Sequence, residues 1–324
     1  MKKVLVIFLF ILICLTGLSQ DVEFSQYYAN PLYLNPAFAG SEEYTRVALN
    51  YRTLLPVSYG DYNTYSASID KYIESISGGI GFQVMNDRQA QGTINELGLN
   101  LTYAYHFKIN KRWNVNAGFK IGYQINSVDA RNLTMPDMID NDGSELPGAE
   151  EGIYKQSMFF DFSAGILSWY NNYYFGFSVD HLSKPVISLG SDEPGIIGRK
   201  YTLHGGLEIP FYNSLHRVHM TLSPNIIIQQ QNSSSKINLG LYLNKDNFTS
   251  GLWIKTNTNL NFSGAVFMLG YYTDIALFAY SYDIPFYLNG LNGIISGAHE
   301  VTFLYFFKYK NKKKKIKAIK CPNF

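Results

Sequence analysis

WNVNAGFKIGYQIN, residues 113–126, decides the fold, because apolar and polar side chains alternate in it without a break. Its apolar positions are Trp113, Val115, Ala117, Phe119, Ile121, Tyr123 and Ile125, and polar residues or glycine stand between them. Successive side chains of a β-strand point to opposite faces of the sheet. The stretch therefore predicts a strand with one apolar and one polar face, long enough to cross a lipid bilayer when tilted.

The same alternation recurs along the chain and predicts fourteen strands. Only a closed barrel places strands in lipid without leaving backbone groups unpaired. We therefore predict an all-β protein, a transmembrane antiparallel up-and-down β-barrel over residues 45–307. The predicted strands are 45–52, 62–70, 78–86, 95–107, 113–126, 157–169, 173–182, 199–209, 218–229, 236–243, 248–255, 263–271, 275–284 and 298–307.

The connections between these strands alternate in length. The longer set is 53–61, 87–94, 127–156, 183–198, 230–235, 256–262 and 285–297, and the shorter set is 71–77, 108–112, 170–172, 210–217, 244–247 and 272–274. Outer-membrane barrels have short periplasmic turns and longer outer loops. The pattern predicts a protein of the cell outer membrane with its N- and C-termini in the periplasm.

Composition agrees with a membrane barrel. Aromatic residues make up 16% of the chain, with 26 Tyr and 22 Phe, while charged residues make up only 16%. Aromatic girdles mark both interfaces of transmembrane barrels. A soluble, secreted β-sandwich is the alternative that also alternates, but such a protein seldom needs so many outward aromatic side chains.

Residues 1–19 read as a secretory signal peptide. A basic start precedes the apolar run 4–15, which is too short for a membrane-spanning helix. Gly17 and Ser19 are small residues that suit cleavage before Gln20. After cleavage Cys321 is the only cysteine, so we expect no internal disulfide.

Residues 20–44 are rich in aromatic side chains but do not alternate. They contain two turn-forming pairs, Asn30-Pro31 and Asn35-Pro36. We expect this segment to fold onto other protein, as a plug or cap at the periplasmic mouth of the barrel. Its four turn residues, Asn30, Pro31, Asn35 and Pro36, are candidate partner-binding residues.

Residues 308–324 form a basic periplasmic tail with eight lysines and no acidic residue. An exported barrel does not meet nucleic acid, so anionic lipid, cell-wall polymer or an acidic protein are the candidate partners. A solvated tail without a partner is the alternative. The candidate binding residues of the tail are Lys313, Lys315, Cys321, Pro322 and Phe324.

No catalytic or cofactor-binding pattern is visible. The six histidines form no spaced metal motif, and no serine or cysteine stands in a nucleophile elbow. We therefore predict no enzyme, no cofactor and no metal. Asp161 and Asp180 are expected to face the lumen and to pair with Arg46 or Arg52, rather than to act as an acid and a base.

The long connection 127–156 is acidic. Its stretch Asp140 to Glu145 superficially resembles a calcium loop, but the glycine is misplaced for an EF-hand. We expect a solvated acidic loop, with calcium binding as the lesser alternative.

Residues 24–40, FSQYYANPLYLNPAFAG, resemble the opening motif of mature proteins of the PorP/SprF family. Further matches follow in family order. They are LNYR at 49–52, TYSASID at 64–70, GGIGF at 78–82, YTLHGG at 201–206, YSYD at 280–283 and GAHE at 297–300.

The resemblance implies an outer-membrane component of the type IX secretion system of Bacteroidota. Family members assist the secretion or surface anchoring of large adhesins with a C-terminal sorting domain, in some cases for gliding motility. Other members contact periplasmic parts of the secretion ring or OmpA-like, peptidoglycan-binding proteins. The residues alone leave a second class open, a channel or transporter for small solutes, because a barrel of this size has room for a lumen.

Overall fold

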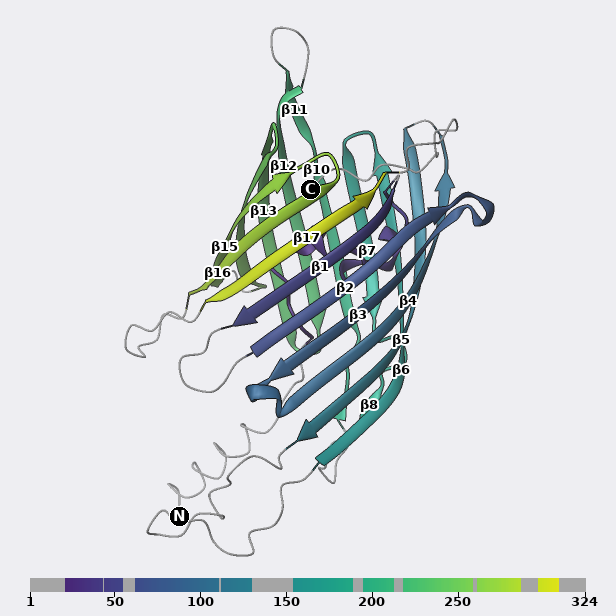
Figure 1. Cartoon of the computed structure of the whole chain (residues 1–324), viewed down its shortest axis with the longest axis vertical. Helices are drawn as coiled ribbons and strands as arrows, with labels where there is room; N and C mark the ends of the chain where they lie inside the picture. Colours follow the sequence, from purple (N-terminus) through teal and green to yellow (C-terminus); the bar gives the residue numbers. More distant parts are fainter. Residues whose placement is uncertain are drawn as a thin grey trace, which may run out of the picture.

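The computed structural model of the 324-residue chain describes residues 21–42, 44–54, 62–110, 112–129, 154–188, 195–212, 218–258, 261–286 and 297–308. Within these residues, fourteen strands form the wall of a closed antiparallel barrel (Figure 1). Their bounds are β1 Thr45–Leu54, β2 Tyr62–Ile73, β3 Gly78–Gln89, β4 Ile94–Lys108, β5 Trp113–Asp129, β6 Tyr154–Tyr170, β7 Tyr173–Asp180, β10 Lys200–Leu207, β12 Val218–Gln231, β13 Ser234–Lys245, β14 Phe248–Asn257, β15 Phe262–Tyr272, β16 Ala276–Pro285 and β17 Ala298–Phe307.

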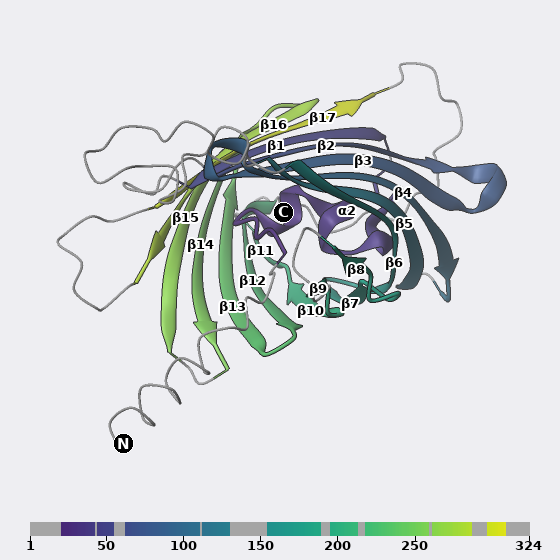
Figure 2. The same cartoon turned by 90° about the horizontal axis from the view of Figure 1, so that it is seen from below.

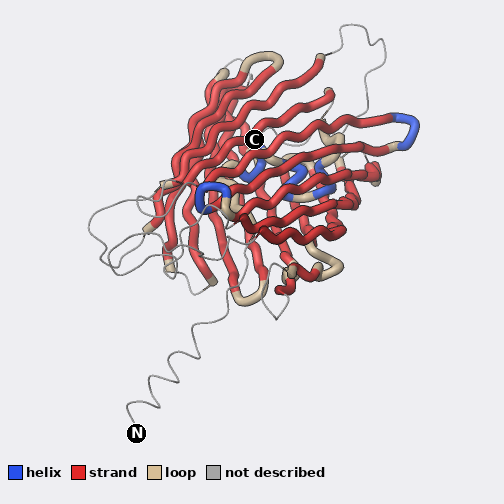
Figure 3. Tube along the Cα trace, turned by 60° about the horizontal axis from the view of Figure 1, so that its bottom comes forward, coloured by secondary structure: helices blue, strands red, loops and turns tan. Residues whose placement is uncertain are grey.

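Each wall strand pairs antiparallel with its neighbours in the chain, and pairing of β1 with β17 closes the barrel. All fourteen predicted strands are present within a few residues of their predicted ends, so the predicted fold class is confirmed. Figures 2 and 3 show the ring of strands around a central lumen.

Three shorter strands lie beside this ring. β8 (Val186–Ile187) and β9 (Gly195–Ile196) pair only with each other, and β11 (Ile209–Tyr212) pairs with β12. On β12, Pro224 lies where the ladder passes from β10 to β11, between the partners Gly206 with Asn225 and Ile209 with Leu222. Proline has no N–H to donate, so it occupies the point where that ladder is interrupted.

The two faces of the wall follow the alternation in the sequence. On β4, Leu101 points outward with 63% of its surface exposed, while the neighbouring Asn100 and Thr102 point inward and are buried. The same arrangement on other strands gives the barrel an outer surface of apolar and aromatic side chains, as a lipid-facing wall requires. Within the described residues, no helix is long and apolar enough to cross a membrane.

The barrel has two unlike ends. We use "short-turn end" for the end with the connections 74–77, 109–112, 171–172, 246–247 and 273–275, and "long-loop end" for the end with 55–61, 130–153, 181–199 and 286–297. Three connections at the long-loop end are nevertheless short. They are 90–93, which contains the 3₁₀ turn η4 (Ala90–Gly92), 232–233 and 258–261, while the short-turn end has one longer connection, 208–217, which contains β11.

The described residues before β1, 21–42 and 44, lie inside the lumen. They form three short helical turns, η1 (Tyr27–Ala29), α2 (Pro31–Leu34) and η2 (Pro36–Phe38). In Figure 2, looking along the lumen, the purple coil with α2 is surrounded by the wall strands. A further turn, η3 (Glu74–Ile76), connects β2 to β3 at the short-turn end.

Candidate functional site

The candidate functional site is the lumen segment, residues 21–42 and 44, together with the wall residues that hold it. Nearly all of its side chains are buried against the inner face of the wall. Its first residue, Asp21, hydrogen-bonds Gln231 at the long-loop end of β12. Towards its other end, the amide of Gly40 donates to Asp70 near the short-turn end of β2. The lumen segment therefore runs along the lumen from one end of the barrel to the other.

Glycines in the wall provide the room for this segment. A Cβ built on Gly79 of β3 would overlap the carbonyl of Ala39, and one built on Gly118 of β5 would overlap the backbone of Pro36 and Ala37. Only glycine lets two backbones approach so closely. The side chain of Asn35 likewise occupies the space beside Gly165 of β6. We call Gly79, Gly118 and Gly165, on three wall strands, the glycine seat.

Buried amide side chains fix the turns of the lumen segment. Asn30 donates to Ser66 and accepts from Gln83 at 2.9 Å. Asn35 accepts from the amide of Ala37 at 2.9 Å and donates to the carbonyl of Ile166 at 3.1 Å. Polar groups removed from water must find such partners, so each Asn-Pro pair couples a turn to the wall.

Aromatic contacts fill the space between these turns. Tyr27 and Tyr28 pack against Trp253 of β14, with ring centroids 5.0 and 6.2 Å apart. Phe38 stacks on His204 of β10 at 5.5 Å. Tyr27, Tyr28, Phe38 and Trp253 belong to one continuous buried cluster that joins the lumen segment to the wall.

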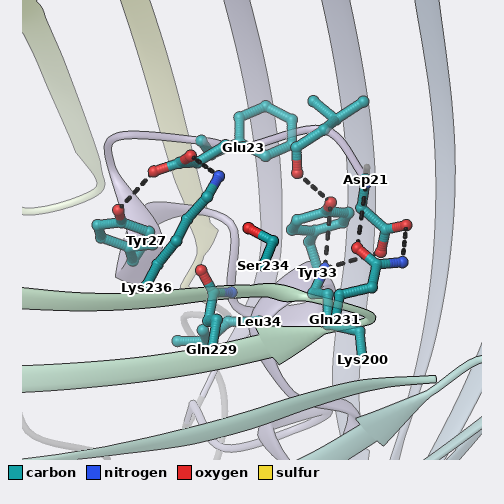
Figure 4. A pocket seen from close by; sticks show the side chains of 12 residues that line it. Asp21, Glu23, Tyr27, Tyr33, Leu34, Lys200, Gln229, Gln231, Ser234 and Lys236 are labelled. Carbon is teal, nitrogen blue, oxygen red and sulfur yellow. Dashed lines mark hydrogen bonds and ion pairs between the residues drawn. The ribbon is translucent and has the colours of Figure 1, made fainter. Parts of the chain in front are cut away.

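Charged groups bind Asp21, the first residue of the lumen segment, at the long-loop end (Figure 4). One oxygen of Asp21 accepts from Lys200 Nζ at 3.0 Å and lies 2.9 Å from His181 Nε2, and the other accepts from Gln231 at 2.8 Å. The second ring nitrogen of His181 lies 2.9 Å from the carboxylate of Asp161. His181 therefore bridges a carboxylate of the lumen segment and one of the wall.

Glu23 makes a second set of ion pairs close by. Its carboxylate lies 2.6 Å from Lys236 Nζ and 3.1 Å from Lys255 Nζ, and it also accepts from the hydroxyl of Tyr27 at 3.2 Å. Lys255 pairs in addition with Asp283 at 2.5 Å. The two acidic side chains at the start of the lumen segment thus each meet two cationic groups of the wall.

A wall carboxylate also caps the backbone of the segment. The fully buried Glu300 accepts from the amides of Ser25 and Gln26 at 2.6 and 3.2 Å. Arg52 lies 3.4 Å from Glu300 and 3.1 Å from Asp283, which balances the charge of both carboxylates. Buried charges of this kind are tolerated because they are paired.

These partners set the ionisation of the groups outside the strands. Burial opposes the charged form of Asp21, but the charges of Lys200 and His181 outweigh it and hold the pKa of that carboxyl well below its usual range. Burial likewise opposes protonation of His181, but the carboxylates of Asp21 and Asp161 raise the pKa of its imidazole to about 10. Asp21 and His181 are therefore both charged at neutral pH.

The candidate residues from the sequence fall into two groups. Asn30, Pro31, Asn35 and Pro36 are all buried in the lumen, where the two asparagines bond to this chain's own wall. Contact of these four with a partner protein stays a prediction. The tail candidates Lys313, Lys315, Cys321, Pro322 and Phe324 lie outside the described residues, as do Asp140 to Glu145.

The predicted partners of the lumen carboxylates were wrong, although Asp161 and Asp180 do face the lumen. Asp180 pairs with Lys120 at 2.9 Å and Asp161 with His181. Arg46 instead pairs with Asp70 at 2.9 Å. Strand register could have revealed the last pair, because Arg46 and Asp70 stand directly opposite each other on β1 and β2.

The first and last described residues lie at opposite ends of the barrel. Asp21 lies at the long-loop end, whereas Thr45 and Phe307 pair with each other at the short-turn end. The periplasmic location of the N- and C-termini, which lie outside the described residues, stays a prediction. The lumen segment fills the interior along its length.

Among the described residues, no group of three or more His, Cys, Asp or Glu side chains is placed to hold a metal ion. The ionisable side chains of the lumen described above instead form ion pairs with one another. This arrangement holds the lumen segment in place. It also lines the mouth at the long-loop end with charged groups.

The comparisons identify a family. Residues 16–305 match the family described as type IX secretion system membrane protein PorP/SprF. No protein of curated function is significantly similar to the chain.

Several solved membrane proteins show partial structural similarity to the chain. They include the Pseudomonas putida toluene transporter TodX, with 9% identity over 89% of this chain and 94% of that chain at a TM-score of 0.46. The CymD monoaromatic hydrocarbon channel has 11% identity over 91% and 96% at 0.47, and a Pseudomonas aeruginosa FadL homologue has 11% over 82% and 89% at 0.43.

Proposed function

Because the chain belongs to the PorP/SprF family of type IX secretion system membrane proteins, we propose that it is an accessory barrel that assists the secretion or surface anchoring of one exported protein. Family and fold make it an outer-membrane β-barrel, and they are not those of a known enzyme family. The proposed client is a large adhesin-like surface protein with a C-terminal sorting domain, which in a gliding bacterium would serve motility.

The observation that carries this proposal is the filled lumen. A solute channel needs a continuous open path, but here the lumen segment is buried along its length and anchored at both ends of the barrel. Releasing it would separate several ion pairs and expose a buried aromatic cluster. A closed barrel suits a protein whose surface binds a partner.

The orientation of the barrel belongs to this proposal. Outer-membrane barrels direct their long loops outward and their short turns to the periplasm. On that rule the long-loop end, with Asp21, meets exported protein at the cell surface, and the short-turn end, with Phe307, faces the periplasm. The basic tail 308–324 would then reach periplasmic parts of the secretion ring or an OmpA-like, peptidoglycan-binding protein.

Two measurements test the proposal. The purified full-length protein in a planar bilayer should show no sustained conductance, and in detergent extracts it should co-purify with an exported adhesin. A variant lacking residues 20–43 serves as the control, because it should conduct if the lumen segment is what closes the barrel. Sustained conductance of the full-length protein, equal to that of the deletion variant, would support the small-solute channel instead.

A further inference from the structure

Within the described residues, one edge of strand β6 pairs with no other strand over residues 154–163. The strand pairs with β5 along all 17 of its residues, from Asp129 with Tyr154 to Trp113 with Tyr170. On its other side it pairs with β7 over only 7 residues, and that ladder ends at Ala164 with Val179. One further bond follows, from the amide of Leu182 to the carbonyl of Phe162. Beyond it, towards the long-loop end, the edge is open.

The open edge presents a regular row of main-chain groups. In an antiparallel strand, the N–H and C=O of one residue point to the same side, and this side alternates along the strand. The main-chain groups of Phe162 point towards β7. The main-chain groups of Phe160, Met158 and Gln156 must therefore point the same way. Within the described residues these three have no main-chain partner on that side. They offer three donors and three acceptors, spaced about 7 Å apart.

The surroundings make this edge more than an ordinary strand end. Met158 and Phe160 stand on the outer face beside it, with 54% and 61% of their surfaces exposed. The hairpin of β8 and β9 belongs to the connection after β7 and lies close to β6, but its ladder bonds run only between β8 and β9. Unpaired backbone next to apolar surface is costly in a membrane protein. The row of groups is satisfied when another extended chain pairs with it.

We propose that the open edge of β6 from Gln156 to Phe160 is the docking site for one extended segment of the exported protein, which adds to the barrel as an extra strand. The inference rests on the proposed function for the identity of the partner. The edge lies at the long-loop end, which that function directs to the cell surface where the client emerges. Only a polypeptide repeats donors and acceptors at the spacing of this row, which neither a lipid nor a small solute does.

The faces of β6 define the chemistry of the added strand. Outward side chains of the client would lie beside Met158 and Phe160, so we expect apolar residues there. Inward side chains would lie beside Ser157, Phe159 and Asp161, so we expect polar or small residues next to Ser157 and Asp161 and an apolar residue next to Phe159. Proline is excluded wherever the client must donate to the row.

The test changes the main chain of the edge without changing its partner strand. The double variant Gln156→Pro/Met158→Pro removes two donors that point away from β5 and leaves the β5 ladder intact. Its matched control is Gln156→Thr/Met158→Thr, which alters the same side chains but keeps both N–H groups. The probe is a panel of purified C-terminal sorting domains of exported adhesins from the same bacterium, and folding is checked by heat-modifiable migration on gels.

We expect the proline variant to bind its client about tenfold or more weaker than both wild type and the threonine control. Equal binding by a folded proline variant would overturn the inference while leaving the proposed function in place. Failure of the wild type to bind any sorting domain would count against the proposed function as well.

A second variant covers the case in which the proline protein does not fold. A photo-crosslinking residue at Gln156 should join the full-length barrel to the bound sorting domain, whereas one at Leu241, an exposed position on the doubly paired strand β13, should not. Crosslinks only within this chain, or only to a second copy of it, would overturn the inference, as would a complex that forms without a crosslink at Gln156.

Discussion

The glycine seat of the lumen segment gives a sharp test of how the barrel is closed. Replacing Gly118 with alanine places a Cβ closer than 3.0 Å to three backbone atoms of Pro36 and Ala37. Backbone atoms cannot turn aside as the end of a side chain can, so either the wall or the lumen segment must move. Overpacking by one methyl group costs about 1–3 kcal/mol. A cost of that size raises the population of the unseated segment about 5- to 150-fold.

The matched control is Gly98→Ala. Gly98 also faces the lumen, but the atoms that a Cβ would meet there are the flexible side-chain end of Gln124. Each Gly→Ala substitution restricts the unfolded chain by the same amount. The difference between the two variants therefore reports only the contact of residue 118 with the lumen segment.

Hydrogen exchange of the full-length protein measures the effect directly. The amides of Phe38 and Ala39 donate to the carbonyls of Asn35 and Pro36 and should be protected in the wild type. We expect faster exchange at these amides in Gly118→Ala, with unchanged exchange in the wall strands and in Gly98→Ala. Equal protection in all three proteins would refute the claim that the glycine seat fixes the segment.

Three further predictions concern the wall, the mouth and the tail. Leu101→Arg should destabilise the barrel by about 2–4 kcal/mol in urea unfolding, because it puts a charge on the lipid face; an unchanged midpoint would mean that the face assignment is wrong. The pKa of His181 is raised to about 10, so its pairs with Asp21 and Asp161 contribute stability that is complete below about pH 6.5 and is lost as the pH rises through 10. Thermal unfolding of His181→Gln should lack this part of the pH dependence, and identical pH profiles for variant and wild type would contradict it. Ending the chain after Phe307 should leave an inserted barrel that co-purifies less with its periplasmic partner, and undiminished recovery of that partner would count against a binding role for the tail.

Much of the wall could be predicted from local patterns. A strand with one face in lipid and one in the lumen must alternate, as residues 113–126 do, and no tertiary information is needed to see it. The abundance of aromatic residues in 20–44 without alternation likewise indicated a segment packed on other protein. These features depend on the chemistry of neighbours in the sequence.

The direction and the partners of the lumen segment depend on residues far apart in the chain. Asp21 meets Lys200 and Gln231, 179 and 210 positions away, and nothing in the sequence near Asp21 reveals which mouth holds those side chains. The same limit explains the wrong partners of Asp180, since Lys120 lies two strands away across β6 and not in the adjacent hairpin. By contrast, strand register could have predicted the pair of Arg46 and Asp70, because the two residues stand opposite each other on β1 and β2.

The threading of residues 21–42 constrains how such a molecule can be assembled. Residues 21–42 contact wall strands from β1, through Asn50, to β17, through Glu300, so their set of partners is complete only when the ring has closed. The lumen segment and the wall therefore reach their final contacts together. Biogenesis and sealing of the pore are, on this geometry, a single event.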